Sequence, residues 1–177
     1  KPVVWSPHGA LQRWEGSTKP LLKRIWELIC NGLLHPNRCV LHVTCRDEAE
    51  ESRRRITRAR IEIVANGVDI PSDVPGRSWT PDGVLRLFFI GRLHPKKGIE
   101  NLLHALKFLD EKVSLTVCGA GEPAYESSLR TLANDLGFSH SVHFSGHVEG
   151  EAKSRAFWNA DICVVPSHTE NFAMVVA

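Results

Sequence analysis

The stretch 85–109 constrains the fold of this chain more than any other part of the sequence. It opens with a mostly apolar run, Leu-Arg-Leu-Phe-Phe-Ile, which is long enough for one buried strand and is ended by Gly91. Apolar residues then recur at three- and four-residue spacing through 99–109, which predicts an amphipathic helix. A strand, a tight loop and a helix in this order form the first part of a parallel β–α unit.

The loop of this unit carries two cations, Arg92 and Lys97. Ligands of open α/β sheets bind at the carboxyl ends of the strands, and basic side chains beside a helix N-terminus suit an anionic group such as a phosphate. We therefore predict an anion site in this loop. One loop by itself leaves open the alternative that both cations are ordinary solvated surface charges.

Alternating segments continue the pattern on both sides of this unit. Strands are expected at 2–6, 39–44, 60–64, 113–118, 142–144 and 160–165, and helices at 19–34, 46–60, 124–136 and 151–158, with another helix that starts after Glu170. The alternation predicts parallel, doubly wound sheets whose loops open toward one edge. Pro and Gly punctuate 71–83, which predicts a linker between one domain at 1–70 and another at 84–177.

The composition argues against several classes of protein. A formal charge of +2 is too small to indicate a nucleic-acid partner, and the arginines of 53–60 follow Glu48, Glu50 and Glu51 at helical distances that would offset them. No apolar run is long enough to span a bilayer. The five cysteines form no Cys-x-x-Cys pair, which favours reduced thiols and a cytoplasmic location. A zinc site made of the histidines at 140, 143 and 147 lacks a fourth ligand and is disfavoured.

The expected helix at 19–34 has a broad apolar face that includes Trp26, and its basic residues Lys19, Lys23 and Arg24 lie near its start. A basic amphipathic helix with Trp is typical of a segment that lies on an anionic membrane surface. The alternative, which we favour, is a helix that packs into the core with its charges in water.

Several short motifs occur in the order and spacing of one known family. They are Phe-Ile-Gly-Arg-Leu at 89–93, Lys-Gly at 97–98, Val-Cys-Gly-Ala-Gly at 117–121, Phe-Ser-Gly at 144–146, Pro-Ser at 166–167 and Glu-Asn-Phe at 170–172. Together they resemble the nucleotide-binding domain of the retaining GT-B glycosyltransferases of family 4, the glycosyl transferases group 1. Ser-Pro-His-Gly at 6–9 and Asn-Gly-Val-Asp at 66–69 resemble the acceptor-side domain and the inter-domain connection of the same family.

The resemblance implies a GT-B fold with two Rossmann-like, doubly wound parallel sheets. Residues 1–70 would be the C-terminal part of the acceptor-side domain, and 84–177 would be the donor-binding domain, truncated at its C-terminus. The second carboxylate of the family's E-x7-E motif would fall immediately after Ala177, and the Gly-rich loop of the acceptor domain is not in the sequence. The chain is therefore expected to be an internal fragment of a two-domain enzyme, with both domains incomplete and no activity by itself.

The resemblance also implies a role for individual residues. Arg92 and Lys97 match the pair that grips the diphosphate of a nucleotide-sugar donor, and Glu170 matches the carboxylate that binds the donor sugar. His8 matches a histidine that faces this sugar from the acceptor domain, so Glu170 and His8 are the expected catalytic residues. The remaining expected donor-binding residues are Gly91, Gly119, Gly121, Val148, Lys153, Asn171, Phe172 and Ala173, of which Val148 and Lys153 would lie near the base.

The function that follows from the resemblance is the transfer of a hexose from a nucleotide-diphosphate sugar to a glycan or lipid-linked acceptor, with retention of the anomeric configuration. Such an enzyme would serve polysaccharide biosynthesis in the cytoplasm, with peripheral contact at the inner face of the membrane as an open alternative. No cofactor and no metal are expected, because the sequence has no Asp-x-Asp motif. A GT-B nucleotide-sugar epimerase and a non-catalytic nucleotide-sugar-binding protein remain alternatives. A dinucleotide-dependent dehydrogenase is disfavoured because the dinucleotide-binding glycine series does not follow Gly91.

Overall fold

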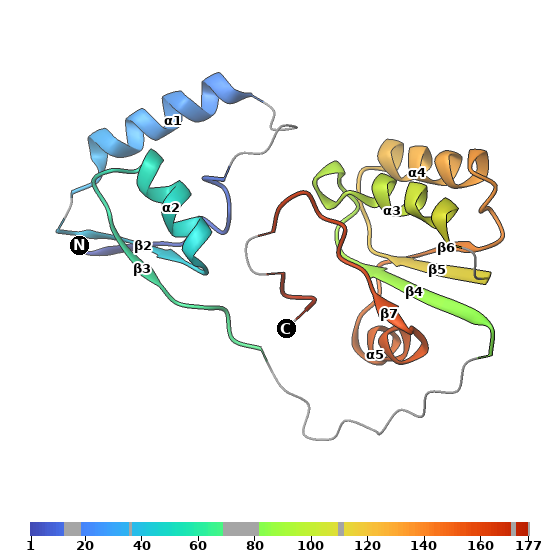
Figure 1. Ribbon diagram of the computed structural model, residues 1–177. Helices are drawn as coiled ribbons and strands as arrows, with labels where there is room; N and C mark the ends of the chain where they lie inside the picture. Colours follow the sequence, from blue (N-terminus) through green and yellow to red (C-terminus); the bar gives the residue numbers. More distant parts are fainter. Residues whose placement is uncertain (13–18, 36, 69–81, 110–111, 171–172, 177) are drawn as a thin grey trace. The chain divides into compact units, whose positions relative to one another are not determined.

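The computed structural model describes residues 1–12, 19–35, 37–68, 82–109, 112–170 and 173–176, and these fall into two compact units (Figure 1). The first unit contains Lys1–Pro71 together with Thr169–Ala177, and the second contains Ser72–His168. The expected domain at 84–177 therefore differs from the second unit in its last nine residues, and the assignment of domains stays a prediction. Both units combine helices with parallel sheets, so the expected α/β fold class is confirmed.

The first unit is built on a three-stranded parallel sheet in the order β1, β2, β3. Its strands are β1 (Val3–Trp5), β2 (Cys39–Val43) and β3 (Arg60–Ile63), joined by the helices α1 (Pro20–Leu33) and α2 (Arg46–Arg55). Figure 1 shows both helices on the same side of the sheet. The buried core of this unit is formed by Leu11, Cys30, Leu41 and Ile56.

Helix α1 exposes most of its apolar residues. Among the described side chains of this helix only Cys30 is buried. The exposed large apolar residues are Leu21, Leu22, Ile25, Trp26, Leu28, Ile29 and Leu33. The interpretation of α1 as a core-packing helix is therefore wrong for the described part of the unit. The stripe of α1 that packs on the rest of the unit contains Glu27, Cys30 and Asn31 and continues into Leu34 just after the helix, and the exposed apolar residues all lie off that stripe. None of the helices in the described ranges is long and apolar enough to cross a membrane.

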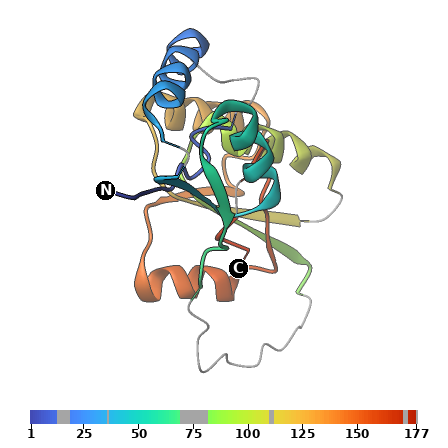
Figure 2. The same ribbon diagram turned by 90° about the vertical axis from the view of Figure 1, so that its left-hand side faces the viewer.

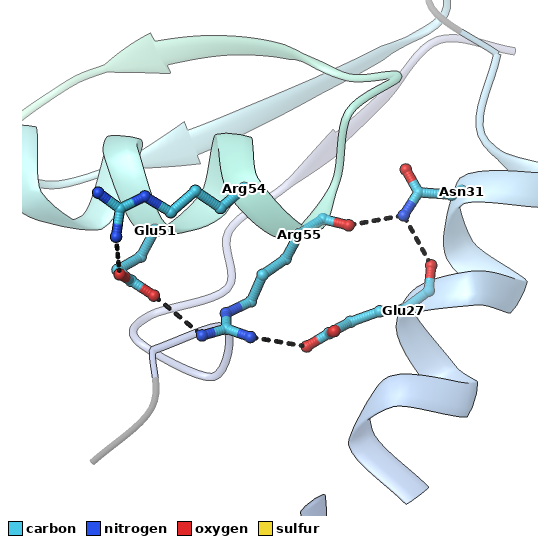
Figure 3. A network of polar contacts seen from close by, with 5 residues as sticks. All are labelled: Glu27, Asn31, Glu51, Arg54 and Arg55. Atoms are coloured by element: carbon cyan, nitrogen blue, oxygen red, sulfur yellow. Dashed lines mark hydrogen bonds and ion pairs between the residues drawn. The ribbon is translucent and has the colours of Figure 1, made fainter. Parts of the chain in front are cut away.

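A polar network joins α1 to α2 (Figure 3). The guanidinium of Arg55 lies 3.0 Å from a carboxylate oxygen of Glu51 and 3.8 Å from one of Glu27. The other oxygen of Glu51 is 3.0 Å from Arg54. The side-chain amide of Asn31 donates to the carbonyls of Glu27 and Arg55, at 2.9 and 2.6 Å. Because Glu51 offsets two of the arginines, the interpretation of this helix as a solvated charged face is preferred to a nucleic-acid patch.

The second unit is a four-stranded parallel sheet in the order β6, β5, β4, β7. Its strands are β4 (Val84–Ile90), β5 (Lys112–Cys118), β6 (Val142–Gly146) and β7 (Ile162–Cys163), and its α-helices are α3 (Ile99–Ala105), α4 (Pro123–Asp135) and α5 (Gly150–Asn159). Figures 1 and 2 show α3 and α4 on one face of this sheet and α5 on the other. The sheet is thus doubly wound, as the alternation of elements predicts.

The core of the second unit follows the two-residue period of its strands. Phe89 of β4 points to the face covered by α3 and α4, where it packs with Ile99 and Leu129. Its neighbour Phe88 points to the other face, where its ring meets that of Phe157 edge-on with the ring centroids 4.9 Å apart. Burial on both faces explains why β4 is almost continuously apolar.

As far as β7, the described elements agree with the expected ones to within a few residues, with two larger differences. Helix α2 ends at Arg55 rather than near Arg60, because Ile56 leaves the helical conformation and becomes buried in the core. Strand β7 contains only Ile162–Cys163. The residues on either side of it still bond to β4, because the N–H of Asp161 donates to the carbonyl of Arg86 and the N–H of Val164 donates to that of Phe88, but they are not part of the strand.

Candidate functional site

The loops that follow β4 and β5 are bound to each other beyond the ends of the two strands. The N–H of Gly91 donates to the carbonyl of Cys118 at 3.0 Å, and the N–H of Leu93 donates to the carbonyl of Ala120 at 2.9 Å. A Cβ on Gly119 would overlap the carbonyl oxygen of Gly91, and a Cβ on Gly121 would overlap that of Leu93. Both glycines are therefore required for the close approach of the two loops.

The segment between β4 and α3 is held by its own side chains and by the chain that follows β7. Nδ1 of His94 accepts a hydrogen bond from the N–H of Lys96 at 3.1 Å and so begins the 3₁₀ turn Pro95–Lys97. Burial lowers the pKa of His94, and the nearby charges of Arg92, Lys96 and Lys97 lower it further. The N–H of His168 donates to the carbonyl of Lys96 at 3.0 Å. These contacts fix the backbone that carries both predicted anion-binding cations.

A cavity of about 410 Å³, here called the edge cavity, opens at the carboxyl edge of the second sheet. Its lining residues are Ile90, Gly91, Arg92, Gly119, Ala120, His147, Val148, Glu149 and Lys153. They come from the ends of β4 and β5, from the loop after β6 and from the start of α5. Such an edge is where open parallel sheets bind their ligands.

The structure brings together five residues that the sequence assigns to donor binding, since Gly91, Arg92, Gly119, Val148 and Lys153 all line the edge cavity. The two other predicted residues of this unit lie next to it. A Cβ placed on Gly91 would lie 4.0 Å from Cε of Lys97, and Gly121 pairs with Leu93 in the adjoining loop. The grouping is an observation, whereas the role of each residue in binding stays a prediction.

The edge cavity also contains two polar residues that received no binding role from the sequence. Nε2 of His147 lies 2.8 Å from Oε1 of Glu149, and this hydrogen bond lowers the pKa of the Glu149 carboxyl. Both side chains are largely exposed. The sequence signal for both residues is their position just after β6, because every loop at this edge of the sheet can reach the cavity. The edge cavity is therefore lined by two cations, Arg92 and Lys153, and by the carboxylate of Glu149, which can accept hydrogen bonds from a neutral polar group.

No group of three or more His, Cys, Asp or Glu side chains that could hold a metal ion occurs among the residues that the structure describes. The disfavoured zinc site at 140, 143 and 147 is not assembled in the described structure.

The expected catalytic residues belong to the first unit. His8 lies in the turn after β1 with an exposed side chain, and Glu170 is half-buried in the segment that begins at Thr169. Asn171 and Phe172 lie outside the described residues. The expected helix after Glu170 is wrong for the residues described there, because 174–176 form a turn that the N–H of Val176 closes on the carbonyl of Ala173 at 2.8 Å. Ala173 has φ 47°, a left-handed conformation that the first turn of a right-handed helix excludes.

Comparison with known proteins identifies the class to which this arrangement belongs. The family of glycosyl transferases group 1 matches residues 77–177, and the chain is a member of this family. A D-inositol 3-phosphate glycosyltransferase of Xylanimonas cellulosilytica is 32% identical over 154 residues, which cover 77% of this chain and 37% of that enzyme. The enzyme described by the same name in Corynebacterium efficiens is 30% identical over 166 residues, with 83% of this chain and 39% of that enzyme covered. The chain thus spans less than half the length of these relatives.

Solved structures show the same fold. Sucrose-phosphate synthase from Thermosynechococcus elongatus superposes with a TM-score of 0.74 at 20% identity, over 97% of this chain and 46% of that one. HepE of Anabaena in complex with UDP-glucose superposes with a TM-score of 0.73 at 17% identity, over 99% of this chain and 50% of that one. The expected GT-B type of fold is confirmed.

Proposed function

We propose that this chain carries the donor site of a glycosyltransferase that takes its sugar from a nucleotide-diphosphate sugar. The observation that carries the proposal is the edge cavity at the carboxyl ends of β4 and β5. Arg92 and Lys153 line this cavity together with Gly91 and Gly119. The matched relatives are described as glycosyltransferases, and HepE is a fold neighbour that binds UDP-glucose. A nucleotide sugar suits the edge cavity because its anionic diphosphate can pair with the cations there, and its base and sugar carry groups that can form hydrogen bonds.

In this proposal the loop after β4 binds the leaving group. The bond between the anomeric carbon and the diphosphate oxygen breaks, and negative charge grows on that oxygen. The acceptor hydroxyl bonds to the anomeric carbon in its place and gives up its proton to the departing diphosphate. Arg92 and Lys97 neutralise this charge from a backbone that is already fixed, which is the arrangement that lowers a barrier most effectively. Glycines at 91, 119 and 121 allow the phosphates to approach the main chain, and Val148 and Lys153 lie on the side proposed for the base.

The sugar itself is proposed to be bound by Glu170 and faced by His8, in a transfer with retention of configuration. The acceptor would be a glycan or a lipid-linked sugar of polysaccharide biosynthesis. The exposed apolar face of α1, with Lys19, Lys23 and Arg24 beside it, supports peripheral contact with an anionic membrane at the inner face of the cell, where a lipid-linked acceptor resides. No metal or other cofactor is part of the proposed reaction.

The proposal is tested with the complete enzyme and a panel of UDP-, GDP- and ADP-sugars, with and without candidate acceptors, by product analysis. We expect one donor to lose its sugar to an acceptor and the anomeric configuration to be kept. Conversion of a donor into a stereoisomer without an acceptor would favour an epimerase. Binding of a donor without any product would favour a nucleotide-sugar-binding protein.

A further inference from the structure

Glu48 is a completely buried carboxylate in the first unit, with 0% of its surface exposed. Because Glu48 lies in the arginine-rich helix α2, its carboxylate would be expected to pair with one of the arginines of that helix. Its hydrogen bonds are instead made to the chain after β2 and to the chain after β1. A buried charged group is retained only where donors replace the water that it has lost, so its contacts define what it does.

One oxygen of Glu48 performs a local task at the start of α2. Oε2 accepts from the N–H of Thr44 at 2.8 Å and from the hydroxyl of Thr44 at 2.9 Å. The Sγ of Cys45 accepts in turn from the N–H of Glu48 at 3.5 Å. This arrangement resembles a capping box, in which a glutamate three residues after the N-cap satisfies a backbone donor at the helix start. Capping therefore accounts for one carboxylate oxygen and leaves the other unexplained.

The second oxygen reaches a distant segment. Oε1 of Glu48 accepts from the N–H of Gly9 at 2.6 Å, across a sequence separation of 39 residues. This N–H belongs to the peptide bond between His8 and Gly9. The position of that peptide plane is set by ψ of His8 and φ of Gly9, so the carboxylate fixes the backbone on the C-terminal side of His8.

The backbone at His8 needs such an external contact. His8 has φ 46° and Gly9 has φ 77°, so two consecutive residues are left-handed, and the first of them is not a glycine. A non-glycine residue in this region is strained, and the strain persists only where the surroundings hold it. Among the described residues, the backbone bonds of the turn run from the N–H of Ala10 to the carbonyl of Pro7, at 2.9 Å, and from the N–H of Gln12 to the carbonyl of Gly9, at 3.0 Å.

The neighbouring side of the turn is also fixed. Nε2 of His42 lies 2.9 Å from the carbonyl of Val64 and must donate to it, because a carbonyl can only accept. In a neutral His42 ring, Nδ1 then accepts from the hydroxyl of Ser6 at 2.9 Å. The ring of His8 meets that of His42 edge-on, with the centroids 6.4 Å apart. The chain after each of the three adjacent strands thus contributes to the support of one exposed histidine at the carboxyl edge of the first sheet.

We propose that Glu48 is a positioning residue for His8, and that its buried carboxylate holds the left-handed His8–Gly9 peptide so that the imidazole is presented in one orientation. This inference rests on the proposed function, in which His8 faces the donor sugar. It adds a residue that touches neither the sugar nor the nucleotide. Glu48 acts on the reaction through the backbone of Gly9.

The test is a double-mutant cycle in the complete enzyme with Glu48→Gln, His8→Ala and the combined variant. In the glutamine variant, one of the two oxygens becomes an NH₂ group that faces the N–H of Gly9 or of Thr44, so at least one hydrogen bond is lost. We expect Glu48→Gln to lower kcat by about 10- to 100-fold, the cost of a small misplacement, with little change in KM for the donor. In the His8→Ala background the same change should alter kcat by no more than about twofold, because residues that act as a unit are not additive.

Glu51→Gln is the matched control, since it makes the same change in the same helix but Glu51 contacts Arg54 and Arg55 instead of the turn. It should lower the melting temperature without changing kcat. Suppose that His8→Ala is impaired and that Glu48→Gln lowers kcat by the same factor in the wild type and in His8→Ala. This result would overturn the inference and would leave the role of His8 intact. Full turnover of His8→Ala would overturn the catalytic role of His8 and the positioning role of Glu48 together, and donor transfer by the enzyme would still stand.

A second measurement does not depend on the folding of any variant. In the complete wild-type enzyme with ¹⁵N-labelled glycine, the amide proton of Gly9 should resonate far downfield and exchange slowly, because it is bonded to a buried carboxylate. An amide of Gly9 that exchanges at the rate of an open turn would overturn the inference.

Discussion

Arg92 and Lys97 project from one loop, and each is expected to take part of the charge of the leaving diphosphate. In the complete enzyme, Arg92→Ala and Lys97→Ala should each lower kcat by roughly two to three orders of magnitude, the range found when one preorganised group that stabilises developing charge is removed. Lys107→Ala, in an exposed position of the same unit, is the control and should retain turnover. Near-normal kcat in both loop variants would show that the diphosphate is bound elsewhere.

His94 should make the stability of the second unit depend on pH. Burial lowers the pKa of His94 in the folded state below its unfolded value of 6.5, and its Nδ1 must stay unprotonated to accept from Lys96. The stabilisation is therefore present above pH 6.5 and is lost as the pH falls through the lowered folded pKa, because the unfolded chain takes up the proton first.

His94→Asn tests this dependence, since asparagine can begin a helical turn without titrating. Urea unfolding of the wild type and the variant at about pH 8 and about pH 5 measures the effect, and the loss of stability at low pH should be smaller in the variant. An equal loss in both proteins would assign the pH dependence to other groups.

Individual residues were predictable from the sequence where their role depends on local position. Arg92 and Lys97 stand out because a strand, a loop and a helix surround them. Glu48 did not stand out, because a glutamate among arginines predicts a solvated ion pair. Its hydrogen-bond partner in the turn, Gly9, is 39 residues away in the sequence. The loop at 146–148, which contains His147, was predicted to reach the edge cavity, whereas Glu149 was missed because its significance comes from the neighbouring strands and not from its own segment.

At the scale of elements, the contact between the loops after β4 and β5 can be tested by filling it. Gly121→Ala places a methyl group against the carbonyl of Leu93, and we expect a loss of about 1–3 kcal/mol in the free energy of unfolding, as in other overpacked sites. Because the displaced loop carries Arg92, the affinity for a nucleotide diphosphate should fall as well. Urea denaturation and calorimetric titration of the complete enzyme measure the two effects.

Gly137→Ala separates this effect from simple backbone strain. Gly137 follows α4 with φ 84° and has open space around its Cα, so its substitution strains the backbone without a collision. We expect a loss of about 1–2 kcal/mol with unchanged nucleotide affinity. If the two variants lowered affinity equally, the close approach of the loops would have no special part in the site.

The helices and strands were predictable because hydrophobic period is a local property of the sequence. Phe88 and Phe89 show the limit of that signal, since a continuous apolar run predicts a buried strand but does not say which helix each side chain meets. Helix α1 shows another limit, because its period indicates an apolar face and says nothing about what covers it. The turn at Ala173 was hidden by an apolar sequence that fits a helix equally well.

For the whole molecule, the alternation of strands and helices predicted parallel sheets, and family motifs predicted the GT-B type. The edge cavity followed from topology, because the loops after parallel strands share one edge. The roles of His8 and Glu170 came from the resemblance alone. Physical reasoning from the sequence could not supply them, since nothing in the local pattern of either segment points to a sugar.

The charge arrangement of the proposed donor site predicts how the complete enzyme responds to metal removal. If Arg92 and Lys97 neutralise the leaving diphosphate, then turnover should be unchanged after dialysis against EDTA, because side-chain cations already supply the charge that a bound metal would provide. The measurement is the initial rate of sugar transfer before and after dialysis, and again after addition of Mg²⁺ or Mn²⁺. Arg92→Ala gives the matching control, since its lost rate should not return with either ion. A rate that disappears with EDTA and returns with Mg²⁺ would instead assign the diphosphate to a metal and leave the two cations with a lesser part in the reaction.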